Sequence, residues 1–201
     1  MNKYLPLTLS LLAVSIPAIA NASSAHIGYE SVSISSVSLT GLSISGSLDI
    51  SDDFSLELSS GSVNTTISGI KVQLDQTDVG AGYNTKFGDT TDLKVFVVRV
   101  SQTLTASWNG YVAQADGTST AYGAAVKTEL TDNVDGLLGF RKSTESGATV
   151  STMFGVSVGV SDSMDLTVSS SGNSTVKSTA IGLRSVERIS GYDNKWSKGT
   201  A

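Results

Sequence analysis

The chain has 201 residues, with 13 Lys and Arg against 18 Asp and Glu, so its formal net charge is −5. It contains no Cys, which excludes disulfides, Cys-based metal sites and a lipid anchor on Cys, and its acidic balance argues against a nucleic-acid partner. Charged residues make up 15% of the chain, below the roughly 25% of an average soluble protein, and the length suits a single domain.

The first 22 residues have the pattern of a secretory signal peptide. Lys3 supplies an early positive charge, an apolar run follows over residues 5–18, and Ala20-Asn21-Ala22 forms a small-x-small cleavage motif. A membrane anchor is the alternative, but the run is shorter than the roughly 20 apolar residues that a spanning helix needs. We therefore expect a signal peptide at 1–22, which leaves one domain and a polar C-terminal tail.

The rest of the chain alternates between apolar and small or polar residues with a period of two. Side chains point alternately to the two faces of a β-strand, so each such segment has one apolar face. The alternation predicts strands and no helix. It is clearest in five segments, namely Leu42–Ile50, Phe54–Leu58, Val79–Tyr83, Tyr122–Leu130 and Phe154–Val160.

Four short turns rich in Asp, Asn, Ser and Gly separate these strands, at 51–54, 88–93, 131–135 and 161–166. Longer polar segments, expected as loops, lie between them at 60–69, 103–118, 144–149 and 171–175, with a further one near 35–38. Short turns alternating with longer loops are typical of transmembrane barrels. The pattern predicts ten strands, with eight as the alternative: 26–35, 39–50, 54–63, 72–86, 92–103, 118–130, 136–144, 149–160, 164–171 and 176–187.

The fold class that follows is all-β: an antiparallel up-and-down transmembrane β-barrel over residues 23–188, with the polar tail at 189–201. A soluble sandwich would show Lys and Glu on its polar faces, whereas these faces carry Gly and Ser. We therefore expect apolar faces toward lipid and a polar interior. The charges expected in the lumen are Asp49, Glu57, Lys127, Glu129, Arg141 and Arg184, and the aromatics expected at the membrane boundaries are Phe54, Tyr83, Phe87, Phe96, Trp108, Tyr111, Tyr122 and Phe140.

Repeated strand–(Thr/Ser)-Asp-(Asn/Asp/Ser)–strand hairpins cover nearly all of the region after the signal peptide. They occur in Gly46–Leu58, Gly80–Asp89, Val126–Asn133 and Gly155–Asp162, and a closing strand includes Ala180–Arg184. In these stretches the chain resembles the small, porin-like or OmpA-like outer-membrane β-barrel proteins of Gram-negative bacteria. The chain departs from the family at its closing strand, which lacks the terminal aromatic residue of such barrels.

The resemblance implies an exported protein of the bacterial outer membrane with no cofactor. Its expected partners are outer-membrane lipids and, during assembly, the barrel-assembly machinery and periplasmic chaperones. An external ligand is not identified by any motif in the chain.

Some related barrels are proteases or lipid A-modifying enzymes that use a His with carboxylates or a Ser. His26 is the only His in this chain and no motif surrounds it, so a polar residue of the first strand is the simpler interpretation, and no enzyme is expected.

Three functions remain open. The first is a non-enzymatic outer-membrane barrel with a structural or surface-interaction role, in which Trp108 and Tyr111 of the longest loop make outward contacts. The second is a narrow pore for small solutes, although ten strands leave little free lumen. The third is a soluble secreted or fimbrial adhesin-like β-protein with water-exposed strands.

Overall fold

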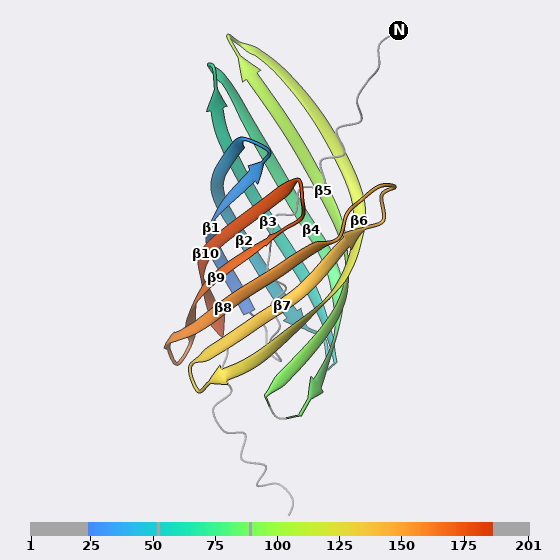
Figure 1. Cartoon of the computed structure of the whole chain (residues 1–201), viewed down its shortest axis with the longest axis vertical. Coiled ribbons are helices and arrows are strands. Elements are labelled where there is room, and N and C mark those ends of the chain that lie inside the picture. The colour runs from blue at the N-terminus through green and yellow to red at the C-terminus, as the bar shows by residue number, and fades with distance from the viewer. Residues whose placement is uncertain (1–23, 52, 89, 187–201) are drawn as a thin grey trace, which may run out of the picture.

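The computed structural model describes residues 24–51, 53–88 and 90–186, and these form a β-barrel (Figure 1). The expected signal peptide at 1–22 and polar tail at 189–201 lie outside the described residues. No helix in the described part is long and apolar enough to span a membrane. The strands are β1 (Ser24–Ile34), β2 (Val37–Asp49), β3 (Phe54–Ile67), β4 (Ile70–Phe87), β5 (Thr91–Trp108), β6 (Tyr111–Thr131), β7 (Val134–Ser143), β8 (Ser151–Ser161), β9 (Met164–Gly172) and β10 (Val176–Val186).

Every strand pairs antiparallel with its neighbours in sequence, and β1 pairs with β10 to close the barrel. The ten-stranded up-and-down fold predicted from the sequence is thus confirmed. Following paired residues once around the barrel from Thr85 leads back to β4 at Gln73, a stagger of 12 residues. Such a stagger accompanies strands that tilt by about 40° from the barrel axis.

The two ends of the barrel differ in height. The short Asp-containing turns gather at one end, and at the other the β3–β4 and β5–β6 hairpins rise well beyond the remaining turns (Figure 1). The prediction of loops at 60–69 and 103–118 is wrong, because β3 and β4 pair up to Ile67 and Ile70, and β5 and β6 up to Trp108 and Tyr111.

Two tight turns make these hairpins regular. Ser68 and Gly69 have φ values of 50° and 81°, and Asn109 and Gly110 have 46° and 81°. Positive φ at both central residues defines a type I′ turn, whose twist matches that of the flanking strands. The strands therefore continue to the tip, although their outer face is polar.

An apolar belt surrounds the outside of the barrel. It follows from the alternation: on β8, Phe154, Val156 and Val158 point outward, while the alternate residues Met153 and Ser157 are buried in the lumen. The exposed belt residues include Ile27, Tyr29, Leu42, Ile44, Leu48, Phe54, Leu56, Leu58, Val79, Tyr83, Val95, Val97, Tyr122, Leu138, Phe140, Phe154, Val156, Val158, Leu166, Val168, Ile181 and Leu183. This outward apolar face is the one that a transmembrane barrel turns toward lipid.

The interior is lined largely by polar side chains, as expected, but two apolar clusters also face the lumen. The first apolar cluster lies below the β1–β2 and β9–β10 turns and consists of Val32, Leu39, Val63, Leu74 and Val176, with Leu104 and three other side chains packed against it. The second apolar cluster consists of Phe96, Val98, Val100, Ala121, Ala125 and Met153. Phe96 is therefore a lumen residue, which corrects its assignment to an outer aromatic girdle.

Candidate functional sites in the lumen and on the projecting sheet

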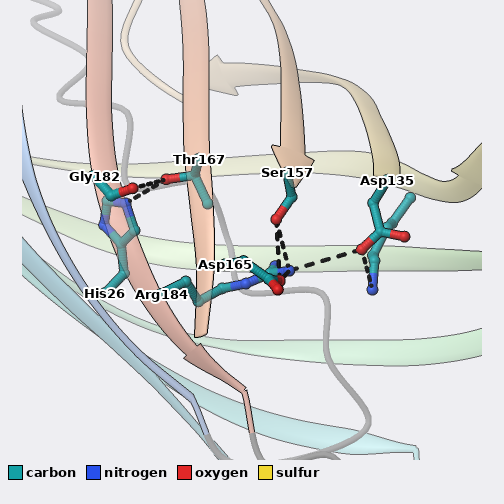
Figure 2. Close-up of polar contacts among 8 residues, drawn as sticks. His26, Asp135, Ser157, Asp165, Thr167, Gly182 and Arg184 are labelled. Atoms are coloured by element: carbon teal, nitrogen blue, oxygen red, sulfur yellow. Dashed lines mark hydrogen bonds and ion pairs between the residues drawn. The ribbon is translucent and has the colours of Figure 1, made fainter. Parts of the chain in front are cut away.

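A network of opposite charges lies in the lumen near the short-turn end, around Arg184 of β10 (Figure 2). Its Nη2 donates to Asp165 Oδ2 at 2.6 Å and to Ser157 Oγ at 3.2 Å, and lies 3.8 Å from Asp135 Oδ2. Lys127 Nζ lies 3.0 Å from the same Asp135 oxygen. Two cations thus face two carboxylates, an arrangement in which buried charges compensate one another.

A second ion pair crosses the lumen. Arg141 Nη1 on β7 donates to Asp78 Oδ2 on β4 at 2.9 Å, and both side chains are less than one-tenth exposed. Gln76 Nε2 donates to the other Asp78 oxygen at 2.8 Å, and Gln102 Nε2 donates to Gln76 Oε1 at 2.7 Å. Because β5 and β6 separate β4 from β7, this bridge braces two non-adjacent walls.

A third pair joins Lys94 of β5 to Glu57 of β3. Lys94 is fully buried, and Asp49 lies close enough for its charge to act on the ammonium group. The sequence-based reasoning placed Glu57 and Asp49 in the lumen but missed Lys94. The signal was present, since Lys94 has the same strand parity as Phe96 and interrupts an otherwise apolar stretch.

Other lumen charges were also missed, namely Glu30, Asp78, Asp135 and Asp165. Glu30 is fully buried and accepts a hydrogen bond from Ser178 Oγ at 2.7 Å. Glu129 keeps the register of Lys127 and pairs with Asp135, so it lies on the lumen face as expected, but its side chain is exposed at the end of β6.

His26 contacts the same region without forming a catalytic pair. Its Nε2 lies 2.9 Å from Thr167 Oγ1, and that hydroxyl donates its proton to the Gly182 carbonyl oxygen at 3.2 Å (Figure 2). The hydroxyl therefore accepts from His26 N–H, whereas a nucleophile would donate its proton to the imidazole. The adjoining cavity has a volume of about 30 Å³, which holds a water or two but no substrate.

A pocket of about 720 Å³, which we call the vestibule, lies at the short-turn end beside the β2–β3 turn and the end of β4. It is lined by Asp49, Ile50, Ser51, Asp53, Asn84, Thr85 and Lys86. Toward the opposite end, side chains from β1, β2, β3, β4 and β10 pack together in the lumen as the first apolar cluster. Within the described ranges, no three His, Asp or Glu side chains gather closely enough to hold a metal ion.

The β3–β6 strands continue past the barrel rim as a four-stranded sheet, which we call the projecting sheet (Figure 1). Its outer face carries polar residues in register across the four strands, namely Ser60–Thr77–Ser101–Thr118, Ser62–Asp75–Thr103–Asp116 and Asn64–Gln73–Thr105–Gln114. These polar rows begin directly above the apolar belt, where the outward apolar residues end. The outer face of the projecting sheet therefore suits a polar environment.

Hydrogen bonds order this polar face. Thr103 Oγ1 donates to Asp116 Oδ1 at 2.7 Å, and Gln114 Nε2 donates to both Asp116 oxygens at 3.0 and 3.1 Å. The bonds from Thr103 and Gln114 hold the pKa of the Asp116 carboxyl below its usual value. Gln73 Nε2 donates to Asp75 in the same way, at 3.0 and 2.9 Å.

Trp108 and Tyr111 lie at the tip of the β5–β6 hairpin, one on each side of the Asn109–Gly110 turn. Their rings stack with centroids 6.0 Å apart and an interplanar angle of 29°. Tyr111 is 68% exposed and Trp108 40%. Trp108 and Tyr111, the two residues predicted to make outward contacts, thus form one aromatic surface at the tip of the β5–β6 hairpin.

No protein-family model and no curated protein sequence matches the chain. Among solved structures, the attachment invasion locus protein Ail of Yersinia pestis is similar at 13% identity and a TM-score of 0.46, and the match covers 82% of this chain and 95% of the Ail chain. The KdgM porin is similar at 9% identity and a TM-score of 0.48, covering 80% and 98%. Neisserial surface protein A is similar at 17% identity and a TM-score of 0.41, covering 81% and 94%.

These values are too low to carry an argument about function. The architecture is established by the barrel itself, from its ten antiparallel strands, the β1–β10 closure and the outward apolar belt. The chain has the fold of a small outer-membrane β-barrel protein.

Proposed function

We propose that this protein is a non-enzymatic, non-conducting barrel of the bacterial outer membrane that holds the projecting sheet at the cell surface for interaction. The observation that carries the proposal is the contrast between the two halves of the molecule. The lower half is a closed barrel with ion pairs in its lumen and an apolar belt outside, and the upper half is an ordered polar sheet with an aromatic tip. Rigid scaffolds commonly support binding surfaces in this way.

The orientation in the proposal follows from the lengths of the two ends. Outer-membrane barrels have short turns on the periplasmic side and longer extensions outside. In this orientation the β3–β4 and β5–β6 hairpins project from the cell, and the vestibule opens to the periplasm.

Cell fractionation tests the location. We expect the protein in the outer-membrane fraction, and we expect its migration on a denaturing gel to change when the sample is boiled, because a closed barrel resists the detergent until heated. Release of the protein into the periplasm or medium would instead support the soluble adhesin-like alternative. That alternative must leave the whole apolar belt in water, whereas exposed apolar patches on soluble proteins rarely exceed a few hundred Å².

Planar-bilayer recording tests the narrow-pore alternative. We expect no discrete current steps from the refolded protein, because the first apolar cluster places packed apolar side chains in the narrow lumen. A known porin inserted in the same bilayers serves as the positive control. Reproducible unitary steps from the heat-modifiable form would establish a pore and refute the non-conducting barrel.

A further inference from the structure

The β6 strand has a long unpaired edge. β5 pairs with β6 all the way to the tip, but β7 pairs with β6 only as far as Ala121, with one more hydrogen bond from Thr144 N to Thr120 O at 2.8 Å. Above this point, residues 112–118 have a strand on one side only. The opposite edge of the projecting sheet is much shorter, because β2 pairs with β3 as far as Asn64 and leaves residues 65–67 beyond it.

The free backbone groups of this edge follow from the hydrogen bond at Thr120. Alternate residues of a strand direct their N–H and C=O groups to the same side. Because Thr120 O points toward β7, the groups of Thr118, Asp116, Gln114 and Val112 point toward the same open side. They form a ready template for a further strand.

This edge lacks the usual protection against strand addition. Natural edges are blocked by Lys, Pro, bulges or covering loops, whereas residues 111–120 contain no Lys, Arg or Pro, and no bulge interrupts their pairing with β5. All of residues 111–118 are exposed. Apart from Asp116 and the aromatic Tyr111 at the tip, the side chains are small or uncharged.

We infer that the β6 edge pairs antiparallel with the β6 edge of a second copy of this chain. The register that fits places Gln114 opposite Asp116 of the other copy, and Asp116 opposite its Gln114. Within one chain the same amide already donates to the same carboxylate, so the exchange conserves a charge-assisted bond. In this register Ala115 meets itself at the two-fold axis and Val112 lies opposite Thr118.

The inference rests on the proposed orientation of the barrel and specifies where the second copy sits. In an antiparallel pair one strand points up and the other down, so the second barrel is inverted and lies in a facing membrane. Seven residues from each strand make a small contact, well below a standard stable interface. Many weak contacts between two membranes add up through multivalency, so we expect adhesion between surfaces that carry many copies.

Cysteine cross-linking tests the register, and the chain offers a clean background because it has no Cys. Opposed residues at non-hydrogen-bonded positions have Cα atoms about 4.5 Å apart, within disulfide reach. We expect about ten times more disulfide-linked dimer from Ala115→Cys than from the matched control Ala113→Cys, whose own partner is Gly117. An equal mixture of Ala113→Cys and Gly117→Cys protein should cross-link as a heterodimer.

A vesicle assay tests the adhesion itself. Proteoliposomes carrying the full barrel at high density should aggregate, as measured by light scattering, and Thr118→Pro should abolish the aggregation. Proline removes an N–H from the open side, while the Thr118 groups are not needed for pairing with β5. Heat-modifiability of each variant reports separately on the barrel, so a failure of the proposed membrane location is distinguished from a failure of the edge pairing.

The inference is overturned if intact barrels give equal dimer yields at positions 113 and 115 and the vesicles stay dispersed. Aggregation that persists in the Thr118→Pro variant would also overturn it. Binding of an added extended peptide by the intact edge, without any dimer, would show that another polypeptide is the occupant and would equally refute self-pairing.

Discussion

Arg141→Met is expected to lower the free energy of unfolding by about 3 to 5 kcal/mol, the typical cost of removing one partner from a buried ion pair. Arg141 and Asp78 are both almost completely buried and meet across the lumen at 2.9 Å. Without the guanidinium, the Asp78 carboxylate keeps only the hydrogen bond from Gln76 on its other oxygen. Denaturant titration of the refolded protein in detergent, followed by fluorescence and gel migration, measures the loss.

A double-mutant cycle separates the pair from its surroundings. Asp78→Asn removes the charge while keeping the shape, so the Arg141→Met/Asp78→Asn double variant should recover much of the loss seen in Arg141→Met. Strict additivity of the two single losses would mean that the residues do not interact, contrary to the cross-lumen bridge.

Leu39→Ala is expected to lower the free energy of unfolding by about 2 to 5 kcal/mol, the usual range for a buried Leu in a packed core. Leu39 is 2% exposed in the first apolar cluster, where Val32, Val63 and Leu74 surround it. The matched control is Leu42→Ala on the same strand, because Leu42 is 63% exposed in the outer belt. There lipid or detergent chains refill the space, so no cavity remains and the loss should be about half or less.

Comparing the two variants also tests which face of the barrel wall is packed against protein and which faces lipid. If Leu42→Ala proved as costly as Leu39→Ala, the outer face would be packed against protein, and the belt would not be a lipid surface. Both variants are measured by the same denaturant titration in the same detergent.

The alternation of side chains was sufficient to predict the ten strands and the short turns. Segments such as Phe154–Val160, apolar on one face and small on the other, leave little freedom in how they pair. The upper hairpins were harder to predict, because the apolar face of residues 103–118 consists largely of Leu104 and of the small residues Ala106, Ala113 and Ala115. Residues 111–118 are all exposed. The strands of these hairpins form because type I′ turns at Ser68-Gly69 and Asn109-Gly110 set the register. The Asn-Gly pair was the available signal.

The lumen was harder to predict than the wall. Around Lys94 both faces of β5 are apolar, with Val95 and Val97 outside and Phe96 and Val98 inside. A rule that places the apolar face outside and the polar face inside therefore cannot tell the two faces of this segment apart. The partner of each inner charge depends on barrel stagger, which brings Arg141 to Asp78 across two intervening strands. That stagger is a property of the closed sheet as a whole.

The uneven height of the apolar belt has a consequence for the surrounding bilayer. Along β3 the belt consists of Phe54, Leu56 and Leu58, and Ser60 already belongs to the polar rows, whereas along β2 the belt runs from Leu42 to Ile50. On strands tilted by about 40°, these stretches rise by roughly 10 Å on β3 and roughly 20 Å on β2, whereas outer-membrane barrels commonly have an apolar band of about 25 Å. Lipid next to β3 must thin most, at a cost of fractions of a kcal/mol for each Å of hydrophobic mismatch. We therefore expect the bilayer to be deformed unevenly around the barrel, and neighbouring barrels to share the deformed lipid on the β3 side.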